Sequence, residues 1–317
     1  MRFYSVIIPV YNRPNEVDEL LESLTKQTFS NFEVLIVEDG SVDKCDTIVE
    51  KYQSQLNITY YYKPNSGQGF SRNFGFENAK GDYFIVFDSD CLIPEHYFQA
   101  VDQYLNEHAV DAFGGPDKAH ESFTAIQKAI SYSMTSPLTT GGIRGNKKHY
   151  GTFHPRSFNM GISRRVYEKV GGYKITRMGE DLEFSIRIIK AGFKTALISG
   201  AFVYHKRRTS LLQFYKQLHF FGRARINLGR FYPREVKLLH WFPAFFTLGF
   251  FSLAVWPWVN VPLAVVGCSA YLVFFMSNFV SSWLKNKSLY VAILSMATSF
   301  TQLFAYGIGF MTEWGKK

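Results

Sequence analysis

Two aspartates, Asp88 and Asp90, follow a run of apolar residues in the stretch FIVFDSDCLIP at positions 84–94. Two neighbouring carboxylates at the end of a buried strand are costly unless a cation or strong hydrogen bonds compensate them. An Asp-x-Asp pair offers hard oxygen ligands to Mg²⁺ or Mn²⁺. Such an ion usually retains several water ligands and also binds the phosphates of a substrate. A cap or turn before Pro94 accounts for one aspartate only. The pair therefore predicts a divalent cation site.

Distinctive residues also end two earlier apolar runs. The first run ends in PVYN at positions 9–12, and the second ends in EDGS at positions 38–41. An Asp-Gly pair alone is usually only a turn. In a parallel α/β sheet, however, ligands bind outside the carboxyl ends of the strands. Three such ends at these intervals predict one shared crevice.

The elements that must position these residues alternate along the first 200 residues. The expected strands and helices follow in turn at 3–11, 14–28, 31–39, 41–55, 58–64, 69–81 and 82–90. Strands that alternate with helices indicate βαβ units and a parallel sheet covered on both faces. The predicted class is α/β, with a mostly parallel, Rossmann-like sheet.

Five segments, in this order and spacing, resemble the family 2 glycosyltransferases of the GT-A fold. They are SVIIPVYNR (5–13), VEDGSVD (37–43), GFSRNFGFENAKGDYFIVFDSD (69–90), FNMGISRRVYEKVGGY (158–173) and GEDLEFSIRIIKAGF (179–193). The resemblance covers about residues 1–210. It implies an enzyme that transfers a sugar from a nucleotide-sugar, most commonly a uridine diphosphate sugar.

The resemblance also implies the residues that bind this donor. Tyr11 packs on the base and Asp39 accepts a hydrogen bond from a base N–H, while Glu38 stands where an aspartate is more usual. Arg72 reaches the diphosphate or the sugar, although an arginine there is also compatible with a plain surface position. The full implied set is Pro9, Tyr11, Asn12, Glu38, Asp39, Arg72, Asn73, Asp88 and Asn159.

The implied general base is Asp181, the aspartate of the GED motif, with Glu180 beside it. Acids in a first helical turn are commonly caps that complement the helix dipole. By the resemblance, Asp181 takes the proton of an acceptor hydroxyl, and Asp90 with Asp88 holds Mg²⁺ or Mn²⁺ against the leaving diphosphate. A single displacement of this kind inverts the anomeric centre. His205 is either a further metal or phosphate contact, or a structural or lipid-facing residue.

Other functions stay open at this point. Processive members of the family carry a Q-x-x-R-W motif after the base, which this sequence lacks. The absence favours addition of one or a few sugars, and the alternatives are a processive polysaccharide synthase with a degenerate motif or a non-catalytic nucleotide-sugar-binding scaffold. A nucleotidyltransferase is a weaker fourth reading. The Gly-rich segment 136–151 is expected to form a mobile flap.

Charge and hydropathy change in the last third of the chain. Positions 206–237 hold nine basic residues and one acid, and apolar spans follow at about 240–259, 261–283 and 289–311. Spans of this length are typical of membrane helices. The sequence predicts a GT-A domain at 1–205, basic interfacial helices at 206–238 and a membrane domain at 239–317. The third span is more polar, so it crosses the membrane or lies at its interface.

The charge pattern also predicts partners and location. The basic segments before the first span and after the second favour the cytoplasmic face of the inner membrane, by the positive-inside rule. The basic segment is interleaved with aromatic residues, which suits anionic lipids better than nucleic acid. Three scattered cysteines favour a reducing compartment. The expected partners are a nucleotide-sugar, a lipid-linked or glycan acceptor and membrane lipids.

Overall fold

The computed structural model describes residues 2–140 and 153–316. Contacts divide the chain into one unit of Met1–His120 with Lys147–Lys206 and a second of Glu121–Asn146 with Arg207–Lys317. The expected domain at 1–205 is therefore interrupted. Helices α5 (Ala125–Thr135) and α6 (Pro137–Thr140) belong to the second unit, because the apolar face of α5 packs against helix α9.

The first unit is built on a mixed sheet, which has seven strands in the described part of the chain. Its order is β3 (Ile58–Lys63), β2 (Phe32–Asp39), β1 (Tyr4–Val10), β4 (Tyr83–Phe87), β8 (Asn159–Ser163), β6 (Ala112–Gly114) and β9 (Thr195–Leu197). Strands β3, β2, β1 and β4 are parallel, and β8 runs antiparallel to both β4 and β6. The predicted mostly parallel α/β sheet is confirmed.

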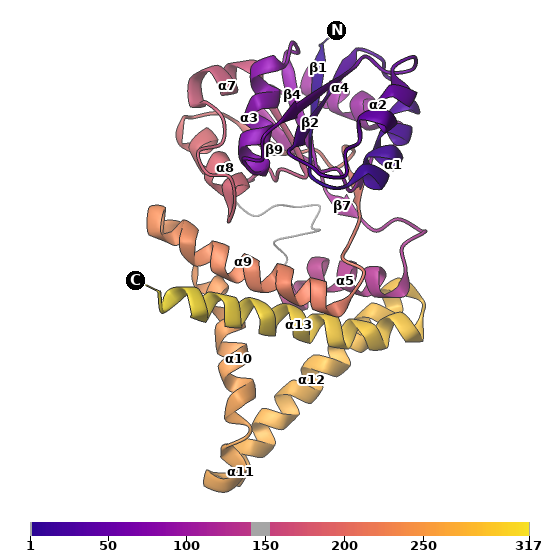
Figure 1. Cartoon of the computed structure of the whole chain (residues 1–317). Helices are drawn as coiled ribbons and strands as arrows, with labels where there is room; N and C mark the ends of the chain where they lie inside the picture. The colour runs from indigo at the N-terminus through magenta and orange to yellow at the C-terminus, as the bar shows by residue number, and fades with distance from the viewer. Residues whose placement is uncertain (1, 141–152, 317) are drawn as a thin grey trace. The chain divides into compact units, whose positions relative to one another are not determined.

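Helices cover both faces of this sheet (Figure 1). Their bounds are α1 (Pro14–Thr25), α2 (Asp46–Tyr52), α3 (Gln68–Asn78), α4 (Tyr97–Glu107), α7 (Arg164–Val170) and α8 (Glu180–Lys190). Successive side chains of β1 alternate between the faces. Val6 and Ile8 pack in the core under α1, α2 and α4, whereas Ile7 packs in the core under α3, α7 and α8.

A small second sheet joins three short strands beside the end of β4. It consists of β5 (Cys91–Leu92), β10 (Val203–His205) and β7 (Asp117–Lys118). Strand β10 runs antiparallel to β5, with His205 opposite Cys91. This pairing brings a histidine from the end of the unit next to the Asp-x-Asp stretch.

The second unit is helical. Besides α5 and α6 it contains α9 (Leu211–Phe231), η1 (Pro233–Glu235), η2 (Leu238–Trp241), α10 (Phe242–Ser252), α11 (Trp256–Val259), α12 (Val261–Asn286) and α13 (Leu289–Trp314). Among the described residues, α12 and α13 are long and apolar enough to cross a membrane, a test that core helices of soluble proteins also pass. The first expected span is broken into α10 and α11, since Pro257 has no N–H to donate to the preceding turn. Of the expected flap, residues 141–151 lie outside the described part of the chain.

Candidate active site

Asp39 ends β2 and is held by the loop that leads into α3. Its carboxylate accepts hydrogen bonds from the backbone N–H groups of Ser66 (2.9 Å) and Gly67 (2.8 Å) and from the Lys63 ammonium. Gly40 follows with a φ of +74°, a left-handed conformation that glycine adopts without strain. Burial alone would raise the pKa of Asp39, but the bonds from Lys63 and Ser66 hold it below its ordinary value. Asp39 is therefore a carboxylate at the rim of the sheet.

Arg72, on the second turn of α3, joins two other elements of the site. Its guanidinium lies 2.8 Å from Asp88 Oδ1, after β4, and 3.3 Å from Glu180 Oε1, at the start of α8. Arg72 is only 1% exposed, and a buried charge requires partners of this kind. Gln68, one turn earlier on α3, also donates a hydrogen bond to Glu180. The beginning of α3 thus contacts Asp39, Asp88 and the GED motif.

Asp181 lies in the first turn of α8, directly after Glu180. Its Oδ2 atom is 3.3 Å from Arg156 Nη1, and its Oδ1 atom accepts the N–H of Leu182 at 2.8 Å. Burial would raise the pKa of Asp181, but the Arg156 charge and the Leu182 N–H hold it below its ordinary value. The pKa of Glu180 is raised, by burial and by the charge of Asp181. Of the two acids, Glu180 is therefore the one that is protonated first as the pH falls.

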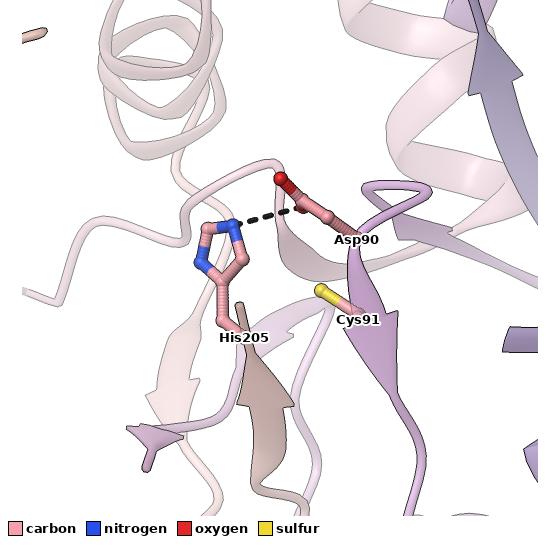
Figure 2. Close-up of side chains that lie close together, drawn as sticks. All are labelled: Asp90, Cys91 and His205. Atoms are coloured by element: carbon pink, nitrogen blue, oxygen red, sulfur yellow. Dashed lines mark ion pairs between the residues drawn. The ribbon is translucent and has the colours of Figure 1, made fainter. Parts of the chain in front are cut away.

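Asp90 lies between a cation from the loop after β1 and a histidine from β10. Arg13 Nη1 is 2.9 Å from Asp90 Oδ2, and His205 Nε2 is 3.1 Å from Asp90 Oδ1. Figure 2 shows His205 and Asp90 pointing toward each other, with Cys91 beside them. The His205 ring stacks on Phe158, with centroids 5.1 Å apart. His205 is thus placed against the Asp-x-Asp stretch.

The donor atoms of Asp90, Cys91 and His205 all lie within 4.8 Å of one another. A carboxylate oxygen and an imidazole nitrogen fit a divalent cation such as Mn²⁺. Cys91 fits less well, because a thiolate is a softer ligand than the oxygen ligands that Mg²⁺ and Mn²⁺ prefer. Asp88, with 32% of its side chain exposed, is the other carboxylate at hand.

Two of the expected donor-binding residues organise the loops after β1 and β2. Asn12 has a φ of +52°, and its side-chain oxygen accepts the N–H of Val42 at 2.9 Å. Glu38 is fully buried and accepts the N–H of Cys45 at 2.9 Å and the hydroxyl of Tyr60 at 3.4 Å. These contacts hold the two strand ends together.

Two asparagines that were expected to bind the donor form hydrogen bonds with other residues of the chain. Asn73 exchanges two hydrogen bonds with the backbone of Tyr173, of 2.7 and 2.8 Å. Asn159 is fully buried; it accepts from Tyr97 Oη at 2.6 Å and donates to the carbonyl of Ala201 at 2.8 Å. In this arrangement both amides position neighbouring segments.

The remaining two expected donor residues lie at the end of β1. Pro9 pairs with Val37 in the sheet register, and Tyr11 follows the strand with 51% of its surface exposed. An exposed ring at the carboxyl edge of a parallel sheet is available to stack on a planar ligand.

The sequence reasoning missed the positively charged partners of the acids. These are Arg13, Lys63 and Arg156. Arg13 follows the PVYN stretch directly, which was the available signal. Its partner is 77 positions away, so spacing along the chain could not reveal the pairing.

Solved structures share the fold. A mannosyltransferase from Pyrobaculum calidifontis, in complex with GDP-mannose and Mn²⁺, aligns with a TM-score of 0.61 at 17% identity, over 100% of this chain and 88% of that one. Residues 1–349 of TarS from Staphylococcus aureus, in complex with UDP-GlcNAc, align with a TM-score of 0.51 at 19% identity, over 95% and 90%.

Curated sequences are also similar. An uncharacterized glycosyltransferase of Haemophilus influenzae is 32% identical over 65% of this chain and 70% of its own length. The poly(ribitol-phosphate) beta-N-acetylglucosaminyltransferase TarS of S. aureus is 36% identical over 35% of this chain, and the minor teichoic acid biosynthesis protein GgaB of Bacillus subtilis is 37% identical over 64%. The chain spans only 20% and 23% of the length of these last two.

The sequence profile of the family described as "Glycosyl transferase family 2" matches residues 5–171, which is more than half of the chain. The match includes the ends of β1, β2 and β4 and the helix α3 that links them. The chain therefore belongs to glycosyl transferase family 2.

Proposed function

We propose that this chain is an inverting, metal-dependent glycosyltransferase that moves a sugar from a UDP-sugar to a lipid-linked or cell-surface glycan acceptor. The observation that carries this proposal is the Arg72 bridge, which brings Asp88 and the GED motif into one site with the Asp39 loop. A similar protein supports the substrate class, since TarS of S. aureus is a poly(ribitol-phosphate) beta-N-acetylglucosaminyltransferase and is solved with UDP-GlcNAc.

The donor is bound at the ends of β1 and β2. Tyr11 stacks on the base, and Asp39 accepts a hydrogen bond from a base N–H. A carboxylate has about four lone-pair sites, and Asp39 uses three of them for Lys63, Ser66 and Gly67. Geometry that is already fixed by these bonds lowers the cost of ordering the site when the donor binds.

Asp181 acts as the general base. An acceptor hydroxyl attacks the anomeric carbon, its proton passes to Asp181, and the nucleoside diphosphate leaves with the electron pair of the broken glycosidic bond. The lowered pKa keeps Asp181 ionised at neutral pH, so its carboxylate has a lone pair for the proton, although the same lowering makes it a weaker base. Asp90, Asp88 and His205 would hold a divalent cation, which would supply charge neutralisation for the departing diphosphate.

The reaction is proposed to take place at the cytoplasmic face of the inner membrane. The second unit supports this placement, because α9 carries a row of basic residues and α12 is a long apolar helix with little burial. A basic helix that also carries apolar residues suits an anionic membrane surface.

Replacing Asp181 by Asn tests the proposal. We expect sugar transfer by the full chain to fall by about 10²–10⁴-fold, the usual contribution of a general base, while titration with UDP shows unchanged binding. Asp46→Asn is the matched control, because Asp46 also lies in a first helical turn and accepts the N–H of its neighbour Thr47. Transfer that persists in the Asp181 variant would refute the assignment of the base.

A further inference from the structure

The two long apolar helices of the second unit differ in how they are packed. In the most apolar 18-residue stretch of each helix, 11% of α12 is buried inside the protein, compared with 56% of α13. The polar residues of α13 lie inside. Buried members of this group are Ser295, Thr298, Ser299, Thr301 and Gln302. Helix α13 is therefore covered by protein along a polar stripe, whereas α12 is largely uncovered.

The first half of α13 packs on α5 and on the end of α12. Thr298 Oγ1 donates to the carbonyl of Ala129, on α5, at 3.1 Å. Ser295 and Ser282, near the end of α12, share a hydrogen bond of 2.7 Å between their hydroxyl oxygens. These contacts fix the start of α13 beside the end of the apolar helix.

The second half of α13 packs closely on α9. A Cβ atom on Gly222 would lie 2.1 Å from the carbonyl oxygen of Tyr306, and one on Gly309 would lie 2.0 Å from that of His219. At this separation the two helices pack backbone to backbone. Small residues are what permits such close approach.

The carboxyl end of α13 is fixed to α9 by an ionic cluster. Glu313 is buried and lies 2.9 Å from Arg223 Nε and 3.4 Å from Arg230 Nη1, both on α9. The Arg230 guanidinium also donates to the carbonyl of Lys316 at 2.7 Å. Both ends of α13 are thus held by the basic helix and its neighbours, along a helix of about 39 Å at 1.5 Å per residue.

Helices α10 to α12 form a hairpin with different chemistry. No charged residue occurs between Lys237 and Lys285. At 1.5 Å per residue, α12 spans about 39 Å, enough to cross the ~30 Å hydrocarbon core of a bilayer. The first arm consists of α10, with 11 residues, and α11, with 4 residues, separated by a turn at 253–255. Trp258, at the tip, is 89% exposed, as is typical of an interfacial aromatic residue. In Figure 1 the hairpin converges on α11, and α13 runs across its open end beside α9.

We infer that the hairpin α10–α12 crosses a lipid bilayer twice and that α13 does not cross it. Helix α13 lies at the membrane surface with α5 and α9, so residue 316 is on the same side as residue 206, where the first unit joins. Of the two possibilities left open for the third span, this inference selects the interfacial helix. This arrangement also keeps Lys316 on the side of the basic segment, in agreement with the positive-inside rule.

Cysteine labelling of the full chain in sealed membrane vesicles tests this topology. The background variant is Cys268→Ser, which removes the exposed native thiol and leaves the buried Cys45 and Cys91. Single reporters are Lys316→Cys at the end of α13, Val259→Cys at the hairpin tip and Lys51→Cys as the reference on the first unit. A membrane-impermeant maleimide is added to vesicles of each orientation.

We expect Lys316→Cys and Lys51→Cys to react from one side and Val259→Cys to react from the other. Labelling of Lys316→Cys from the tip side would show that α13 crosses, and labelling of Val259→Cys from the Lys51 side would show that the hairpin does not. Either result overturns the inference. Thr312→Cys, also exposed on α13, is a second reporter in case Lys316→Cys disturbs the chain end. The readout does not depend on sugar transfer.

Discussion

At the level of single residues, the carboxylates of the site are each paired with a cation. The pairs are Asp39 with Lys63, Asp88 and Glu180 with Arg72, Asp90 with Arg13, and Asp181 with Arg156. An opposite charge at this distance favours the ionised carboxylate against the effect of burial. The pairing explains how adjacent aspartates are tolerated at the end of the buried strand β4.

Replacing Arg156 by Gln is expected to raise the pKa of Asp181, because the largest effect that lowers this pKa is the Arg156 charge. The acid limb of the kcat/KM profile should then move to higher pH. Arg165→Gln is the control, since Arg165 is exposed and its acidic partner is Asp111, 3.9 Å away, and not Asp181. An unchanged acid limb would mean that Asp181 does not govern it.

The same pairing makes stability depend on pH in a defined direction. The folded-state pKa of Asp181 lies below its ordinary value of about 3.9. Its contribution to stability is therefore complete above that value and is lost as the pH falls through the folded-state pKa. In Arg156→Gln this contribution should shrink, and thermal unfolding at pH 7 and at about pH 3 should show a smaller difference than in the unaltered chain.

His205→Ala is expected to weaken Mn²⁺ binding by about tenfold or more, the scale on which changes at a metal site act. The physical reason is the loss of a nitrogen ligand 3.1 Å from Asp90 Oδ1. Electron paramagnetic resonance of added Mn²⁺ measures free ion directly, and removal of metal with EDTA should abolish transfer until Mn²⁺ is restored. His108→Gln, at an exposed position, should bind Mn²⁺ normally; equal binding by both variants contradicts the assignment.

At the level of elements, glycines decide which helices can approach each other. Gly222 on α9 and Gly309 on α13 permit the close packing of these helices, and Gly307 faces Pro243 and Thr247. An interface that depends on small residues is sensitive to a single methyl group, because a packed interior has no room for added volume.

Gly222→Ala is expected to destabilise the second unit by about 1–3 kcal/mol, since its Cβ would overlap the Tyr306 carbonyl. Replacing glycine by alanine within a helix otherwise stabilises it by about 1 kcal/mol. A loss of stability in Gly222→Ala would therefore indicate a steric clash at this position. The matched control is Gly315→Ala, where the nearest atom is 3.9 Å from the added Cβ. Thermal unfolding of the full chain in detergent measures both, and a higher Tm for Gly222→Ala would contradict the close packing.

At the level of the whole molecule, the chain combines an α/β unit with a helical unit in which the hairpin α10–α12 exposes apolar side chains. The uncharged hairpin and the basic helix α9 would contact a membrane in different ways, by apolar burial and by attraction to anionic headgroups. Salt screens the second interaction but not the first.

The full chain is therefore expected to remain in the membrane fraction after washing with 1 M salt, where the Debye length is about 3 Å, and after an alkaline carbonate wash. Immunodetection of the pellet and the supernatant measures the outcome. Release by salt alone would show that α9 provides the attachment and that the hairpin is not inserted.

The sequence by itself determined the α/β class, the strand ends that carry the carboxylates, the family and the apolar segments. These features follow from local periodicity and from motifs within short stretches. Only the tertiary structure decided which cation pairs with which acid, which asparagines bind backbone groups, that α5 belongs to the second unit and that the polar stripe of α13 is buried. Those outcomes depend on contacts such as that between Arg72 and Glu180, 108 positions apart, and no pattern along the chain records a distance of that kind.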